Sequence, residues 1–263
     1  MPSDEAGTLC AVAHADPPRA VCLLSGGMDS AVTLAEARAA GFSTYALTVK
    51  YGQRHACELA AARRVAQALG TTEQREFELD LSVFGGSALT GRGTIPKGRN
   101  QAAITAGGVP ATYVPARNTV FLALALAWAE ALGARDLFLG VNAIDYSGYP
   151  DCRPEFLSAF EGLARLATAA GTEHGARFRV HAPLLALTKR DIVLRAEELG
   201  VDLGLTHSCY DPLEEGGLVL ACGGCDACSL RLKGFREAGR RDPIAYVEPR
   251  PAVAGRGSSA PSP

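Results

Sequence analysis

The chain has neither a strong excess of charge of one sign nor a long hydrophobic run. Its 26 Lys and Arg residues and 28 Asp and Glu residues leave a formal net charge of −2. This balance argues against a basic stripe for nucleic acid or a polybasic membrane face, although arginines can still gather around a phosphate. The longest apolar stretch, residues 120–132, contains Glu130 and is shorter than a bilayer requires. We therefore predict no nucleic-acid partner and no membrane association.

Residues 1–18 also lack the basic start and the apolar core of a signal peptide, and they carry Asp4, Glu5 and Asp16 instead. This composition predicts a cytoplasmic protein. No internal repeat is present, and 48% hydrophobic residues in a chain of 263 are enough for a sizeable core. Residues 1–18 and 248–263 are rich in Pro, Gly, Ser and Ala, which predicts two mobile tails.

Apolar runs alternate with helical runs between these tails, as in a doubly wound α/β fold with a mostly parallel sheet. Residues 19–185 are predicted to form this domain, and residues 186–247 a smaller helical segment that bears cysteines. Between residues 85 and 108, seven glycines and little periodicity indicate a long loop, either a functional lid or a disordered segment. The pattern predicts strands at residues 20–24, 45–49, 73–79 and 137–140, and helices at residues 31–40, 57–69, 119–132, 154–170 and 188–200.

The sequence SGGMDS, residues 25–30, lies between the first expected strand and helix. Paired glycines let the backbone approach a ligand closely, and a helix N-terminus presents free N–H groups to an anion. No Gly-Lys-Ser/Thr follows, which excludes a Walker A loop, and a third glycine is missing, which excludes the dinucleotide fingerprint. The hexapeptide resembles the PP-loop of ATP pyrophosphatases, which holds the pyrophosphate of ATP. The alternative is an ordinary strand-to-helix turn with a serine cap.

Two short segments place basic side chains near ends of the expected elements. YGQRH, residues 51–55, offers Arg54 for an anion and His55 for proton transfer near neutral pH. The alternative is a polar helix start with a solvated arginine. Arg117 precedes an apolar helix, where a basic residue opposes the helix dipole unless an anion binds there too.

DYSGYPDCR, residues 145–153, combines hydrogen-bonding groups with two aromatic rings. Such a segment suits a site for a flat polar heterocycle, and a surface turn explains it about as well. Cys152 is better explained as a packed or exposed thiol than as a nucleophile, because the sequence places no base beside it. Lys189 stands out because the chain contains only four lysines.

Four of the eight cysteines form a set. Cys222, Cys225 and Cys228 are separated by two residues each, and Cys209 lies upstream of them. Four soft thiolates with a Gly-Gly turn favour zinc in a closed structural site, which would not take part in catalysis. The alternatives are an iron–sulfur cluster, which also uses Cys-x-x-Cys-x-x-Cys runs, and unliganded thiols.

Taken in order, several motifs resemble the 7-cyano-7-deazaguanine synthase (QueC) family from residue 20 to about residue 243: SGGMDS, YGQRH, PARN, DYSGYPDCR, LTKRDIV, THSCYDP and CGGCDACSLRLKGF. Residues 213–219 and both tails are longer than is usual in that family. The resemblance implies a ligase that uses ATP and ammonia to convert 7-carboxy-7-deazaguanine to the nitrile through adenylate and amide intermediates, in queuosine or related 7-deazapurine biosynthesis. It also implies a homodimer.

The resemblance further implies roles for individual residues. ATP, with Mg²⁺ bridging its phosphates, is expected to contact the loop, the helix that follows and one arginine: Leu24, Ser25, Gly26, Gly27, Met28, Asp29, Ser30, Ala31, Val32, Thr33, Leu34 and Arg117. Catalytic roles fall to Asp29, Ser30, Arg54, His55 and Lys189. The deazapurine is expected on Asp145, Tyr149, Asp151 and Arg153, and zinc on Cys209, Cys222, Cys225 and Cys228. His55 and His207 are the candidate proton acceptors for ammonia.

Two other classes of function stay open at this point. One is a different PP-loop enzyme, such as a tRNA-modifying thiolase or an amide-forming synthetase. The other is a non-catalytic zinc module that binds a partner. Consumption of ATP that depends on the carboxylated deazaguanine distinguishes these classes.

Overall fold

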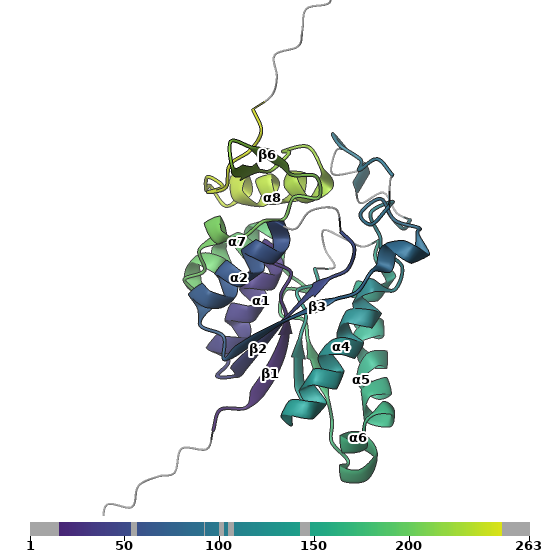
Figure 1. Ribbon diagram of the computed structural model, residues 1–263. Coiled ribbons are helices and arrows are strands. Elements are labelled where there is room, and N and C mark those ends of the chain that lie inside the picture. Colours follow the sequence, from purple (N-terminus) through teal and green to yellow (C-terminus); the bar gives the residue numbers. More distant parts are fainter. Residues whose placement is uncertain are drawn as a thin grey trace, which may run out of the picture.

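The computed structural model describes residues 16–53, 57–91, 93–99, 103–104, 108–142 and 148–248. At its centre is a five-stranded sheet in the order β3-β2-β1-β4-β5, in which every neighbouring pair of strands is parallel (Figure 1). The predicted parallel α/β sheet is confirmed, and β5, only three residues long, was not predicted. The strands are β1 Arg19–Leu23, β2 Ser43–Lys50, β3 Glu73–Glu78, β4 Asp136–Phe138 and β5 Arg179–His181.

Helices cover both faces of the sheet (Figure 1). On one face lie α1 Met28–Ala39, α2 Cys57–Leu69 and α7 Lys189–Glu198, and on the other lie α4 Arg117–Leu132, α5 Pro154–Ala167 and α6 Ala169–His174. The helix predicted at residues 154–170 breaks at Thr168, because its side chain accepts a hydrogen bond from the N–H of Gly171 and starts a new helix. No helix in the described part of the chain is both long and apolar enough to cross a membrane.

The alternation of side chains along β1 divides the core into two layers. Val21 and Leu23 pack beneath α4, whereas Cys22 and the adjoining Leu24 pack beneath α1 and α2. Both sides of β1 are therefore buried, as expected of the central strand of a parallel sheet. This burial fixes the position of the loop that follows β1.

The last part of the chain lies over the carboxyl edge of the sheet (Figure 1). It contains the hairpin β6 Leu213–Glu215 and β7 Leu218–Leu220, followed by α8 Asp226–Glu237. Residues 213–219 thus form most of a surface hairpin. A Cβ on Gly234 would lie 2.7 Å from the Cβ of Lys189, so α8 crosses α7 at close range where α7 begins. The division into domains at residues 185 and 186 remains a prediction.

Three short 3-10 helices complete the described elements: η1 Leu81–Phe84, η2 Pro150–Cys152 and η3 Leu203–Leu205. In the glycine-rich segment predicted to be a loop, Ala88, Leu89 and Ile95 are buried in the core layer beneath α4. Residues 87–90 and Ile95 are thus packed into the fold, whereas the other described residues of this segment are half-buried or exposed.

Candidate functional site

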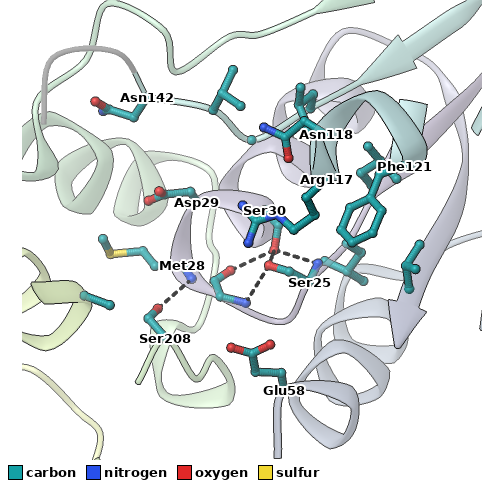
Figure 2. Close-up of a pocket in the computed structure, with 18 of the residues that line it drawn as sticks. Ser25, Met28, Asp29, Ser30, Glu58, Arg117, Asn118, Phe121, Asn142 and Ser208 are labelled. Carbon is teal, nitrogen blue, oxygen red and sulfur yellow. Dashed lines mark hydrogen bonds between the residues drawn. The ribbon is translucent and has the colours of Figure 1, made fainter. Parts of the chain in front are cut away.

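A pocket opens at the carboxyl edge of the sheet, above the ends of β1, β2 and β4. The start of α1, the start of α4 and one side of α8 also contribute to its walls (Figure 2). Open parallel sheets bind ligands at this edge, where several strands and helix N-termini converge. The sequence predicted a ligand site at this edge, and ligand binding there remains a prediction.

The glycine loop is held by the hydroxyl of Ser30. Ser30 Oγ accepts a hydrogen bond from the N–H of Ser25 at 3.2 Å, contacts Ser25 Oγ at 3.1 Å and donates to the carbonyl of Gly27 at 3.0 Å. Gly27 is the N-cap of α1 and supplies no side-chain cap, so the serine-capped turn considered above is not what forms. The N–H of Met28 donates to Ser208 Oγ at 3.3 Å. These hydrogen bonds fix the shape of the loop.

Gly26 brings the loop against α2. Its φ of +87° lies in the region that glycine tolerates, and a Cβ at this position would lie 2.3 Å from the carbonyl oxygen of Glu58. The N–H of His207 donates to the carbonyl of Gly26 at 2.8 Å. Any other residue at position 26 would push the loop away from α2.

Asp29 and Lys189 form an ion pair at the edge of the pocket. Lys189 Nζ lies 2.6 Å from Asp29 Oδ2, and the lysine side chain is 8% exposed. The lysine is aimed by the start of α7, where Thr188 and Asp191 form a capping box that fixes the helix end. Asp29 Oδ1 is buried and has no hydrogen-bond partner among the described residues. The pair therefore presents a buried ammonium group and a carboxylate oxygen to one cavity.

Arg117 reaches the pocket from the first residue of α4. Its guanidinium carbon lies 5.6 Å from the ring centre of Tyr51 and 6.0 Å from that of Phe121, within reach of a cation–π interaction with each ring. Ala116, before it, is the only described residue other than glycine with positive φ, at 54°. The hydroxyl of Tyr113 accepts a hydrogen bond from its N–H at 2.9 Å. The chain enters α4 in a strained conformation that points Arg117 into the pocket.

We expect Ala116→Gly to leave the free energy of unfolding unchanged or to raise it by up to about 1 kcal/mol. Relief of left-handed strain, about 1–2 kcal/mol, is partly offset by the greater entropy that glycine gives the unfolded chain. Chemical denaturation measures the difference. The matched control is Ala123→Gly, at an exposed position of α4, which should lower stability by about 1 kcal/mol. Equal losses in both variants would contradict strain at Ala116.

The residues predicted for the deazapurine divide into three cases. Tyr149 lines the pocket, with its hydroxyl 3.0 Å from Thr112 Oγ1. Asp151 is buried outside the pocket lining; its carboxylate accepts a hydrogen bond from the N–H of Asn118 at 2.9 Å, which braces the start of α4. Arg153 is exposed at the N-cap of α5. Contact of these residues with a substrate remains a prediction.

Asp145, Arg54 and His55 lie outside the described residues. Of the residues predicted for ATP, several line the pocket, namely Leu24, Ser25, Gly27, Met28, Asp29, Ser30 and Arg117. Others, namely Ala31, Val32, Thr33 and Leu34, are buried along α1 and anchor the loop from below. Their contact with a nucleotide also remains a prediction.

The thiol of Cys152 faces the pocket from η2. Burial raises its pKa to about 12, and the charge of Asp151 acts in the same direction. Asn118 Nδ2 donates to the sulfur at 3.3 Å. The thiol is therefore protonated at neutral pH, which fits the packed role expected of it.

Several pocket residues were not singled out from the sequence, among them Glu58, Asn118, Asn142, Ser208 and Tyr210. Asn118 and Ser208 lie inside motifs that were noted for their neighbours. Glu58 lies three residues after the noted segment YGQRH. Burial raises the pKa of Glu58 to about 7, although the charge of Arg117 opposes this shift.

The four predicted metal ligands come together away from the pocket floor. The sulfur atoms of Cys209, Cys222, Cys225 and Cys228 all lie within 4.8 Å of one another. Backbone N–H groups donate to two of the sulfurs: that of Cys222 to Cys209 Sγ at 3.2 Å and that of Cys225 to Cys222 Sγ at 3.3 Å. In a tetrahedral site with Zn–S distances of about 2.3 Å, sulfurs lie about 3.8 Å apart. The distances between the sulfur atoms would therefore need to shorten only slightly for all four to bind one ion.

The glycine-rich segment is fastened to this cysteine cluster. Lys97 Nζ lies 2.6 Å from Asp211 Oδ2, and the N–H of Gly98 donates to the carbonyl of Gly224 at 2.8 Å. Arg99 forms a second ion pair with the buried carboxylate of Asp226. These contacts link residues 97–99 to the turns that carry the cysteines.

The chain is similar to known proteins over most of its length. The family model described as "Queuosine biosynthesis protein QueC" matches residues 19–239. Proteins named 7-cyano-7-deazaguanine synthase are similar over most of the chain. That of Syntrophotalea carbinolica is 60% identical over 229 residues, covering 87% of this chain and 96% of the relative, and that of Paramagnetospirillum magneticum is 58% identical over 228 residues, covering 87% and 98%.

Among solved structures, the NMN synthetase of Francisella tularensis aligns over 76% of this chain and 68% of its own, with a TM-score of 0.43 and 19% identity. The match to the family model spans most of the chain and includes the glycine loop, Lys189 and all four clustered cysteines. On this evidence of sequence, the chain belongs to the QueC family.

Proposed function

We propose that the chain catalyses the ATP-dependent conversion of 7-carboxy-7-deazaguanine and ammonia to 7-cyano-7-deazaguanine, in queuosine or related 7-deazapurine biosynthesis. The observation that carries this proposal is 60% identity over 229 residues with a relative of that name. The pocket supports it, because it brings together groups that bind a polyanion: a glycine loop, a helix N-terminus, Arg117 and Lys189.

The reaction has to replace both oxygens of a carboxylate, which is a poor electrophile. A carboxylate oxygen attacks the α-phosphorus of ATP and pyrophosphate leaves. Ammonia then attacks the carbonyl carbon, AMP leaves and an amide remains. The amide oxygen is activated by a second ATP in the same way, and its departure with AMP and loss of the nitrogen protons yields the nitrile.

The residues of the pocket suit this chemistry. Backbone N–H groups of the loop and of the start of α1 would stabilise charge that develops on pyrophosphate. Lys189 and Arg117 would neutralise phosphate or carboxylate charge. Asp29 Oδ1, a buried carboxylate oxygen without a partner among the described residues, would hold Mg²⁺, which would neutralise phosphate charge. Tyr149 would lie along the flat heterocycle.

Zinc is the ion we propose for the cysteine cluster, bound by Cys209, Cys222, Cys225 and Cys228. A site closed by four thiolates supplies folding energy and leaves no position for a substrate. The proximity of the sulfurs favours one ion over a multi-iron cluster, whose core would hold the sulfurs farther apart. Assembly into a homodimer remains a prediction, which sedimentation analysis in solution would test.

The product nucleotide tests the proposal directly. With 7-carboxy-7-deazaguanine, an ammonium salt and MgATP, we expect AMP and pyrophosphate, a transient amide and then the nitrile by mass spectrometry. Glutamine should not replace ammonium. ADP as the principal product would contradict α-phosphorus attack, and ATP consumption independent of the deazapurine would favour a different PP-loop enzyme. No ATP consumption with any of these substrates would favour a binding module.

A further inference from the structure

An acidic side chain stands in a pocket that otherwise suits anions. The described pocket lining contains two carboxylates, Asp29 and Glu58. Asp29 is neutralised by Lys189 at 2.6 Å. No ion pair within the described residues neutralises Glu58. A carboxylate beside ATP and a second carboxylate would repel both substrates unless its negative charge serves a cationic or proton-bearing reactant.

The position of Glu58 is fixed relative to the glycine loop. It lies in the first turn of α2, and the close approach of its carbonyl to Gly26 holds that turn against the loop. Figure 2 shows its carboxylate turned toward the loop, across from Arg117. It therefore lies next to the residues that we propose hold the activated end of the nucleotide.

The amide-forming step requires a proton acceptor. When ammonia attacks the acyl-adenylate, the new C–N bond leaves a positive charge on nitrogen, and the C–O bond to AMP breaks. A proton must leave that nitrogen for the neutral amide to form. We propose that a carboxylate oxygen of Glu58 accepts this proton, an inference that rests on the proposed function.

Other groups in the pocket serve this role less well. The ammonium group of Lys189 carries a proton already and is paired with Asp29. The thiol of Cys152 stays protonated because burial raises its pKa to about 12. Burial raises the pKa of Glu58 to about 7, which lets it exist in both states near neutral pH. His207 is the rival within the described lining.

Glu58→Gln keeps the size of the side chain and removes the base. In the full-length protein, amide formation from 7-carboxy-7-deazaguanine, MgATP and ammonium chloride should fall by about 100-fold or more. Carboxylate-dependent exchange of labelled pyrophosphate into ATP, which stops at the adenylate, should change by less than about 3-fold. With hydroxylamine in place of ammonium, Glu58→Gln should still form the hydroxamate near the wild-type rate. A protonated hydroxylamine nitrogen is far more acidic than ammonium, so it loses its proton without a protein base.

Three further variants complete the test. Glu78→Gln removes a carboxylate that is 72% exposed and should behave as wild type in all three assays. Glu58→Asp should retain part of the ammonium-dependent rate, and circular dichroism should show native folding. His207→Gln is run in parallel.

Three results would overturn the inference. The first is an unchanged ammonium reaction in Glu58→Gln, and the second is equal losses of exchange and of amide formation in that variant. The third is a lost amide-forming activity that hydroxylamine rescues in His207→Gln but not in Glu58→Gln. Equal losses would place Glu58 with the nucleotide or its Mg²⁺. Absence of carboxylate-dependent exchange in the wild-type protein is a distinct result, because it defeats the proposed function and this inference together.

Discussion

Lys189→Met is expected to lower kcat/KM by about 10³-fold, because it removes a buried cation from the pocket where we propose that charge develops on pyrophosphate. The lysine side chain is 8% exposed, and α8 crosses directly over it at Gly234, so the fold holds its ammonium group in place at the pocket wall. A steady-state assay of pyrophosphate release measures the effect. Lys233→Met, on α8, is the matched control and should retain near-normal activity.

A second variant separates catalysis from folding. Lys189→Met alone leaves the carboxylate of Asp29 without its partner, which should also lower the melting temperature. Asp29→Asn combined with Lys189→Met removes both charges. This double variant should recover most of the lost melting temperature without recovering turnover. Recovery of activity in the double variant would show that the pair serves folding and not the reaction.

Removal of the metal is the other large expected effect. Cys225, which is fully buried, is the N-cap of α8, and Cys225→Ala should reduce the zinc content from about one ion per chain to a small fraction. We expect the melting temperature to fall by about 10 °C or more, since metal binding supplies folding free energy of several kcal/mol. Elemental analysis and calorimetry measure both quantities.

The matched control for that substitution is Cys57→Ser, at the start of α2 and outside the cluster, which should keep full zinc content. Limited proteolysis near Lys97 and Arg99 should become faster in Cys225→Ala alone, because their partners Asp211 and Asp226 flank the clustered cysteines. Stoichiometric iron with labile sulfide in the wild-type protein would contradict the zinc assignment.

Local sequence signals predicted the elements that carry strong periodicity. The helix expected at residues 57–69 is α2 as observed, and the strand expected at residues 73–79 matches β3 to within one residue. The short strand β5 escaped prediction because three residues, one of them exposed, carry no alternation to detect. The break between α5 and α6 depends on a single side chain, Thr168, which periodicity does not register.

The site was predicted in part for a similar reason. Motif chemistry pointed to Asp29 and Lys189 separately, but 160 positions separate them, and only the folded chain pairs them. Asp151 lay in a segment rich in hydrogen-bonding groups, yet its carboxylate faces Asn118 and not the pocket. Glu58 was missed because an acidic residue in the first turn of a helix is ordinary. Only its half-buried position beside the glycine loop makes it unusual.

The contacts of residues 97–99 also bear on the order of events during synthesis. Arg99 is paired with Asp226, which is translated 127 residues later, whereas β2 pairs with β1 and with β3 over short stretches of chain. Contacts of long sequence separation form late, because a long loop must first be closed. A ribosome that has passed β3 therefore exposes a glycine-rich segment whose partners do not yet exist. Residues 97–99 can reach Asp211 and Asp226 only after α8 has begun to form. With the zinc that we propose for the cysteines, metal supply would then set one of the last steps of maturation.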